Sequence, residues 1–115
     1  FESGTENAPG IFALAARLGE IEALGPEAIA TRILMLRDRQ EAGLHAGGWQ
    51  ITSPGGDAER SGILTARHET IATEEAIDRL SAAGIRASAR GGALRLSPHV
   101  ANTEAEIDRA LNVLA

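Results

Sequence analysis

Residues 93–103 read ALRLSPHVANT, a strand-like run that contains a cation and is followed by polar groups. Alternate side chains of a strand face opposite sides of a sheet, so Leu94 and Leu96 are predicted to face a core and Arg95 to face away from it. A guanidinium with small neighbours on its own face is accessible and can hold a carboxylate by two parallel hydrogen bonds. Spacing alone favours the alternative, which is a solvated arginine on the exposed face of a two-layer fold.

The segments around this stretch show alternating helical and strand patterns. The apolar spacing predicts helices at residues 9–24, 26–44, 73–83 and 103–114, and strands at 49–52, 62–67, 85–89 and 93–97. Paired strands with helices between them indicate an α+β fold. We therefore expect a two-layer small domain, in which a mostly antiparallel sheet of about four strands is covered by helices on one side.

Several residues mark the expected boundaries of these elements. Gly25 is placed to cap the first helix, and Pro26 suits the first turn of the second. Arg90, Gly91 and Gly92 are typical of a hairpin turn between the last two strands. Thr73 is expected to cap the third helix. The run of residues 103–106, TEAE, matches the capping box of a helix N-terminus.

Composition excludes several classes of function. The chain has 115 residues, 43% of them hydrophobic, and a net charge of −5, with no basic stripe of the kind that duplex-binding domains carry. No apolar run is long enough to span a bilayer, and no signal-peptide pattern opens the chain. Cysteine is absent, which removes disulfides and thiolate nucleophiles. We expect a cytoplasmic protein without nucleic-acid or membrane partners.

Lysine is also absent, because all 11 basic residues are arginine. The side chains of this chain therefore cannot form a Schiff base with a carbonyl compound. The sequence begins with Phe1 rather than methionine, and we expect it to be a piece of a longer protein.

Two segments carry a resemblance to a known family. Residues 94–111, LRLSPHVANTEAEIDRAL, are similar to the C-terminal signature of the class V aminotransferase family of pyridoxal-phosphate enzymes, which includes cysteine desulfurases, kynureninases and isopenicillin-N-epimerase-like proteins. Residues 1–25, FESGTENAPGIFALAARLGEIEALG, resemble the family segment that leads from the large domain into the small one. The resemblance implies that residues 1–24 are the tail of the large domain and that residues 25–115 are the C-terminal small domain.

The resemblance also implies roles for individual residues. Arg95 matches the arginine that binds the α-carboxylate of an amino-acid substrate, and His99 lies at a family position near the substrate. Gly4 and Thr5 match a loop that reaches the cofactor phosphate of the neighbouring subunit in a homodimer. Pyridoxal phosphate itself would be held by a lysine of the large domain, which these residues do not include. The expected partners are therefore that large domain, a second identical subunit and the substrate, and no catalytic or metal-binding residue is expected here.

The expected function is that of a pyridoxal-phosphate enzyme of amino acids, with this chain inactive alone. Family desulfurases carry a nucleophilic cysteine on a loop before the arginine strand, where this chain has the turn at residues 90–92 and no cysteine. A persulfide-forming desulfurase is thus disfavoured, and an aminotransferase, an epimerase or a lyase stays open. The alternative is a non-catalytic α+β module that binds a partner. The helix at 9–24 distinguishes the two, because its apolar stripe would be exposed in an isolated enzyme piece. Self-association would favour that piece, and a monomer that binds a partner would favour the module.

Overall fold

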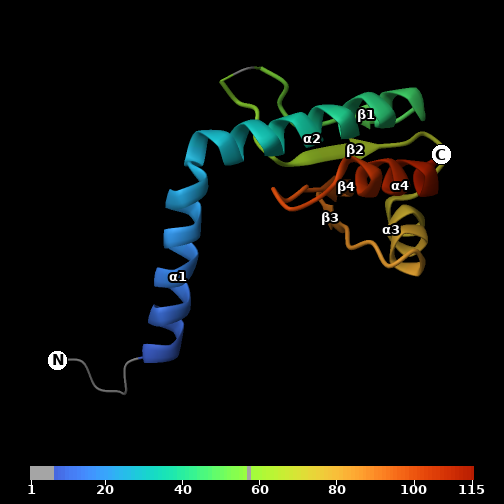
Figure 1. The fold of residues 1–115 in the computed structure, drawn as a ribbon. Coiled ribbons are helices and arrows are strands. Elements are labelled where there is room, and N and C mark those ends of the chain that lie inside the picture. Colours follow the sequence, from blue (N-terminus) through green and yellow to red (C-terminus); the bar gives the residue numbers. More distant parts are fainter. Residues whose placement is uncertain (1–6, 57) are drawn as a thin grey trace.

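The computed structural model describes residues 7–56 and 58–115. The helices are α1 (Ala8–Leu24), α2 (Pro26–Ala46), α3 (Thr73–Ala82) and α4 (Glu104–Leu114), and the strands are β1 (Gln50–Ile51), β2 (Leu64–Arg67), β3 (Ser88–Arg90) and β4 (Ala93–Leu96). This order of elements is the one that the sequence predicts. Figure 1 shows the strands and three of the helices in one body, from which α1 projects.

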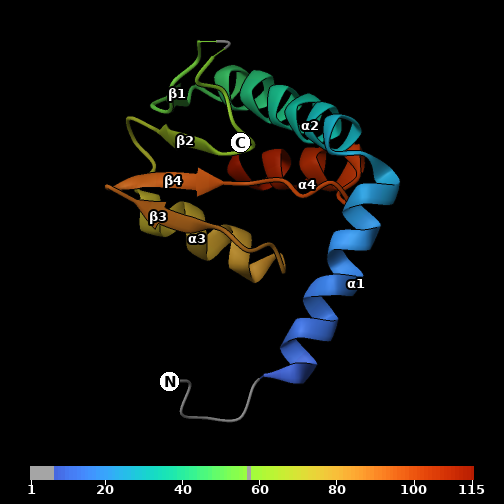
Figure 2. The same cartoon turned by 90° about the vertical axis from the view of Figure 1, so that its left-hand side faces the viewer.

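The four strands form one sheet in the order β1-β2-β4-β3, and every neighbouring pair is antiparallel. Helices α2, α3 and α4 pack together against one face of this sheet, while α1 extends away beside it and covers neither face (Figure 2). The predicted α+β fold, with a four-stranded antiparallel sheet covered on one side, is confirmed. Its uncovered side is called the open face below.

The core lies between the sheet and the three helices that cover it. Leu94 and Leu96 of β4 are 0% and 4% exposed, and their register partners Ala66 and Leu64 of β2 are buried with them. Burial of a leucine side chain stabilises a fold by about 1.5–3 kcal/mol, so these four neighbours fix which side of β4 faces inward. The helices complete the core with Leu36, Leu44, Ala76, Leu80, Ile107, Ala110 and Leu114.

The β3–β4 hairpin is tighter than the sequence suggests. Gly91 and Gly92 have φ angles of 56° and 73°, a left-handed conformation that favours glycine and is typical of two-residue hairpin turns. The strand expected at 85–89 begins only at Ser88. The backbone N–H of Ile85 instead donates to the carbonyl of Leu80, so Ile85 still belongs to the C-terminal turn of α3.

The predicted helix ends agree with the structure in three places out of four, and Pro26 is the first residue of α2 as expected. Gly25, with φ of 83°, caps α1 by donating to the Ile21 carbonyl at 3.0 Å. Thr103 and Glu106 form the full capping box of α4. The prediction for Thr73 is wrong, because Ala72 is the N-cap of α3. The Thr73 hydroxyl donates to the carbonyl of Gly92 at 2.9 Å instead, which ties α3 to the hairpin.

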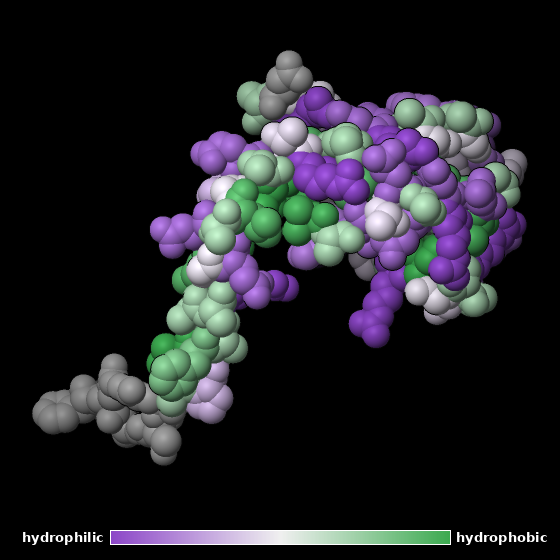
Figure 3. Space-filling view, in the orientation of Figure 1, coloured by the Kyte–Doolittle hydropathy of each residue, from purple (hydrophilic) through white to green (hydrophobic). Residues whose placement is uncertain are grey.

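Helix α1 contains no buried residue. Its large apolar side chains are exposed, and they are Ile11, Phe12, Leu14, Leu18, Ile21 and Leu24. Figure 3 shows these apolar residues as green surface along the projecting helix and at its junction with α2. The radius of gyration is 17.3 Å, against about 13 Å for a compact chain of this length. None of the described helices is long and apolar enough to cross a membrane.

The exposed stripe of α1 should make the isolated chain self-associate, because a contiguous apolar surface of this kind is normally covered. Analytical ultracentrifugation of the 115-residue chain should show dimers or larger species at micromolar concentration. The double variant Leu14→Glu/Leu18→Glu should sediment as a monomer. Ala13→Glu/Ala16→Glu adds the same charge to exposed positions outside the leucine stripe and should still associate. A wild-type monomer would contradict the expectation.

Candidate substrate-binding face

Arg95 lies on the open face of the sheet, as the alternation of β4 predicts. Its register partners are Thr65 on β2 and Ser88 on β3, while Leu94 and Leu96 on either side of it are buried under the helices. The Arg95 side chain is half-buried, and within the described residues its guanidinium has no hydrogen bond and no ion pair. The cation is therefore available to a group from outside this part of the chain.

The other arginines show how unusual this is. All 11 arginines fall within the described ranges. Those paired with carboxylates are Arg17, Arg32, Arg37, Arg39, Arg60 and Arg79. Those that donate to backbone carbonyls without such a pair are Arg67 and Arg109. Only Arg86, Arg90 and Arg95 make neither kind of contact in the described chain, and all three belong to the β3–β4 hairpin or the residues leading into it.

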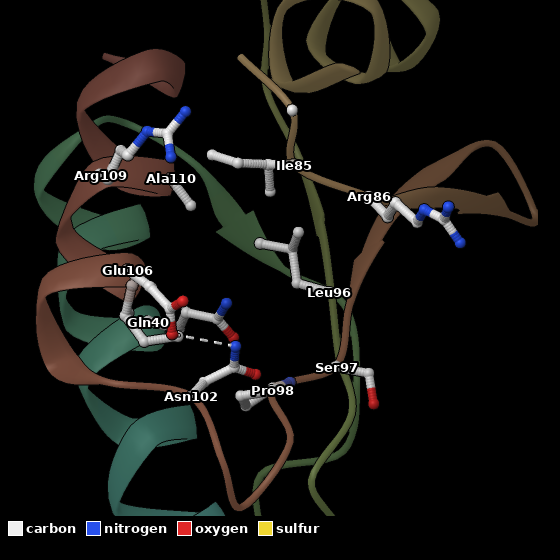
Figure 4. Close-up of a pocket in the computed structure, with 12 residues that line it drawn as sticks. Gln40, Ile85, Arg86, Leu96, Ser97, Pro98, Asn102, Glu106, Arg109 and Ala110 are labelled. Atoms are coloured by element: carbon white, nitrogen blue, oxygen red, sulfur yellow. Dashed lines mark hydrogen bonds between the residues drawn. The ribbon is translucent and has the colours of Figure 1, made fainter. Parts of the chain in front are cut away.

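These three cations share the open face. Ser88 lies opposite Arg95, and Arg90 follows Ser88 by two residues, so alternation places Arg90 on the same side of the sheet as Arg95. In Figure 4 the side chains of Arg86 and Ser97 point away from Ile85 and Leu96, which face the helices. None of the four strands contains an acidic residue. A chain of net charge −5 thus presents a positive region on this face.

A shallow hollow of about 240 Å³ lies within this positive region. Its lining consists of Arg86, Ala87, Ser88, Arg95 and Ser97. It therefore offers two guanidiniums and two hydroxyls, and no carboxylate of the described chain lines it. Guanidinium and hydroxyl groups are donors suited to carboxylate or phosphate oxygens. The hollow is the part of the described chain best suited to an anion.

His99 does not line the hollow. It is exposed in the loop between β4 and α4, and its Nδ1 accepts a hydrogen bond from the backbone N–H of Ala101 at 3.2 Å. The backbone N–H of His99 donates to Asn102 Oδ1 at 2.7 Å. These contacts hold the turn that follows the arginine strand, while Nε2 is left without a described partner. The structure thus places His99 near Arg95 in the chain but outside its hollow.

The same turn is anchored to the start of α4. Glu106 accepts hydrogen bonds from the Thr103 backbone N–H at 2.8 Å and from the Asn102 amide at 3.2 Å, the latter drawn dashed in Figure 4. The bond from the Thr103 backbone, followed by the one from Asn102, lowers the pKa of the Glu106 carboxyl below its ordinary value. A charged Glu106 therefore fixes the loop that leaves β4.

A second cavity, of about 300 Å³, lies on the helix side of the sheet (Figure 4). Its lining includes Glu106, Asn102 and Gln40, a residue that is 4% exposed and whose Oε1 has no hydrogen-bond partner among the described residues. Leu96 separates this cavity from the open face on which Arg95 lies. Arg86 and Ser97 border both spaces, but Arg95 lines only the hollow on the open face.

Two of the expected site residues, Gly4 and Thr5, lie outside the described residues. Within the ranges that the structure describes, no group of three or more acidic or histidine residues could hold a metal ion. Sequence reasoning missed Arg86. A signal was present, because Arg86, Ser88 and Arg90 alternate toward the glycine turn and would meet Arg95 and Ser97 across the hairpin.

Comparisons with known proteins support the assignment of this chain to an α+β small domain. No family model and no curated protein matches the sequence. A solved structure of a NifS-like protein superposes with a TM-score of 0.83 at 30% identity, covering 97% of this chain and 34% of that protein. NifS-like proteins and cysteine desulfurases are members of the class V aminotransferase family. The chain is a C-terminal small domain of that family.

Two cysteine desulfurase structures share the fold of this class V small domain. The apo enzyme from Thermococcus onnurineus NA1 has a TM-score of 0.90 at 24% identity, covering 99% of this chain and 32% of its own. CsdA from Escherichia coli, solved in an S-sulfonic acid form, has a TM-score of 0.82 at 20% identity, covering 99% and 31%. The chain thus spans about a third of the length of these proteins.

The low pKa of Glu106 makes the loop sensitive to acid. Because the folded pKa lies below the unfolded one, the stabilisation is present at neutral pH. It is lost as the pH falls from the ordinary glutamate pKa of about 4.3 through the lower pKa of Glu106 in the folded state. Glu106→Gln should therefore reduce the free energy of unfolding by more at pH 7 than at pH 3, measured by urea denaturation. Glu22→Gln removes an exposed carboxylate of α1 and should have no effect at either pH. An equal loss at both pH values for Glu106→Gln would contradict this explanation.

Proposed function

We propose that this small domain supplies the substrate-carboxylate site of a pyridoxal-phosphate enzyme that acts on an amino acid. The observation that carries the proposal is the guanidinium of Arg95, which lies on the open face without an acid partner in the described chain. Such a cation, flanked by hydroxyl groups, suits the α-carboxylate common to all amino acids. The family resemblance of residues 94–111 gives Arg95 the same role.

The physical contribution of Arg95 would be binding and orientation. A planar guanidinium binds a carboxylate through two parallel hydrogen bonds, which fixes the plane as well as the position of the bound group. Because Arg95 sits in the middle strand of a three-stranded run, with β2 and β3 on either side, its backbone is held rigidly. A substrate held this way has one Cα bond presented to the cofactor, which is an effect of orientation rather than of acid–base chemistry.

The chain does not hold the cofactor by itself, because it contains no lysine to carry pyridoxal phosphate. When bound to the rest of the enzyme, that cofactor serves as the sink for electrons released at the substrate Cα. We assign the attachment of pyridoxal phosphate to the remaining two thirds of the full-length enzyme. Gly4 and Thr5 would contribute an amide and a hydroxyl to the cofactor phosphate of the neighbouring subunit, as the family segment implies. Turnover by the 115 residues alone is not expected.

For the reaction we propose transamination, epimerisation or elimination. Two structural neighbours are cysteine desulfurases, but this chain has no cysteine that could form a persulfide. The β3–β4 turn consists of Gly91 and Gly92 alone, so there is no loop before the arginine strand to carry such a nucleophile. A desulfurase that uses a cysteine of the small domain is therefore disfavoured.

The proposed partners are the large domain of the same enzyme and a second identical subunit. Helix α1 supports the first, because its exposed apolar stripe needs a covering surface and the structural neighbours are about three times longer than this chain. We place residues 1–24 with that large domain and residues 25–115 in the small domain. The cytoplasmic location stays a prediction.

The alternative is a non-catalytic module that binds a partner protein. A monomeric 115-residue chain with a saturable protein ligand would favour it. The same α1 stripe argues against this alternative, because a free-standing module gains nothing from a projecting helix without a buried residue.

In the full-length enzyme, Arg95→Ala should raise the KM or Kd for the amino-acid substrate about 10- to 100-fold. This range follows from the loss of a charge-assisted pair worth about 1.5–3 kcal/mol. The cofactor absorbance of the purified holoenzyme should be retained. Arg79→Ala removes an arginine that is paired with Glu75 on α3 and should leave KM unchanged. Loss of cofactor with unchanged substrate affinity in Arg95→Ala would refute the assignment.

A further inference from the structure

The hollow on the open face contains one guanidinium more than an α-carboxylate requires. Arg86 and Arg95 both line it, together with the Ser88 and Ser97 hydroxyls. A single carboxylate has two oxygens and is fully engaged by one bidentate guanidinium. Once Arg95 holds the α-carboxylate, Arg86 stays without an anionic partner in the described chain.

Leaving two arginines together without an acid is unfavourable, since like charges repel. The chain could relieve this easily, because it has 16 acidic residues and uses many of them to pair its other arginines. Instead the strands around the hollow carry only neutral and basic side chains. This segregation of charge is what a site for an anion from outside the chain requires.

Arg86 is distinguished by its position from Arg90, the third arginine of this face that has no partner in the described chain. Arg90 pairs in register with Ala93 beside the glycine turn, two residues along β3 from the Ser88–Arg95 pair, and it does not line the hollow. Arg86 lies on the other side of Ser88, next to Ser97. Arg86, Arg95, Ser88 and Ser97 thus line one space of about 240 Å³.

We propose that Arg86 is a specificity-determining residue that binds an anionic group on the side chain of the substrate. The substrate class is then an amino acid with two acidic groups, such as an α-amino dicarboxylic acid. This inference rests on the proposed function, because Arg95 must hold the α-carboxylate for Arg86 to receive the second anion. The Ser88 and Ser97 hydroxyls donate further hydrogen bonds to the two anionic groups.

The test measures binding of L-aspartate, L-glutamate and L-alanine to the full-length holoenzyme, by titration of the cofactor absorbance or by calorimetry. Wild-type enzyme should bind the better of the two acidic amino acids at least about tenfold more tightly than L-alanine. Arg86→Gln should weaken that acidic ligand about 10- to 100-fold and change L-alanine by less than about threefold. Arg95→Gln should weaken all three ligands. Arg90→Gln removes the same charge from the same face outside the hollow and should leave the preference intact.

The outcomes separate the two proposals. If Arg95→Gln weakens no ligand, the carboxylate site itself is wrong. If Arg95→Gln weakens all ligands, but Arg86→Gln weakens acidic and neutral amino acids equally or weakens neither, only the second anion site is overturned. An Arg86→Gln enzyme that loses stability without a change in ligand preference would mean that Arg86 pairs with an acid of the large domain, and it would overturn the inference as well. If Arg90→Gln weakens the acidic ligand as much as Arg86→Gln does, the preference comes from the general charge of the face. That result would also overturn the inference about Arg86.

Discussion

The pairing of β4 with β2 and β3 is the constraint on which the rest of this domain depends. Leu94 and Leu96 are buried against the helices, and a slip of one residue would expose both of them and bury Arg95. The buried leucines therefore set the register, and the register directs the guanidinium to the opposite side. The packing of Leu94 and Leu96 thus positions the guanidinium of Arg95, and no acid of the described chain neutralises it.

A second consequence concerns the distribution of charge. Most arginines of the chain pair with acids on helices or loops, as Arg39 does by two hydrogen bonds to Asp108 of 2.6 and 2.7 Å. That pair links α2 to α4 on the helix side and raises the pKa of Arg39. The hairpin cations have no such partner in the described chain. The two sides of one sheet thus differ: one buries apolar groups under helices whose arginines have partners, and the other presents arginines that have none in the described chain.

Much of this fold could be predicted from the sequence, because the decisive patterns are local. The alternation of Leu94, Arg95 and Leu96 gives the orientation of the arginine, and residues 103–106 give the start of α4. The failures came from tertiary contacts. The Thr73 hydroxyl serves the hairpin turn rather than its own helix, and Ile85 remains attached to the end of α3. Arg86 was missed because its neighbours depend on the register of the β3–β4 hairpin. That register follows from the two-residue glycine turn, which the sequence analysis did not define.

The most direct test is a crystal structure of the full-length enzyme with an amino acid bound. The account predicts that the α-carboxylate lies within hydrogen-bond distance of both terminal nitrogens of Arg95, on the face of the sheet opposite α2, α3 and α4. An α-carboxylate bound elsewhere, with Arg95 paired to an acidic side chain of the enzyme, would contradict it.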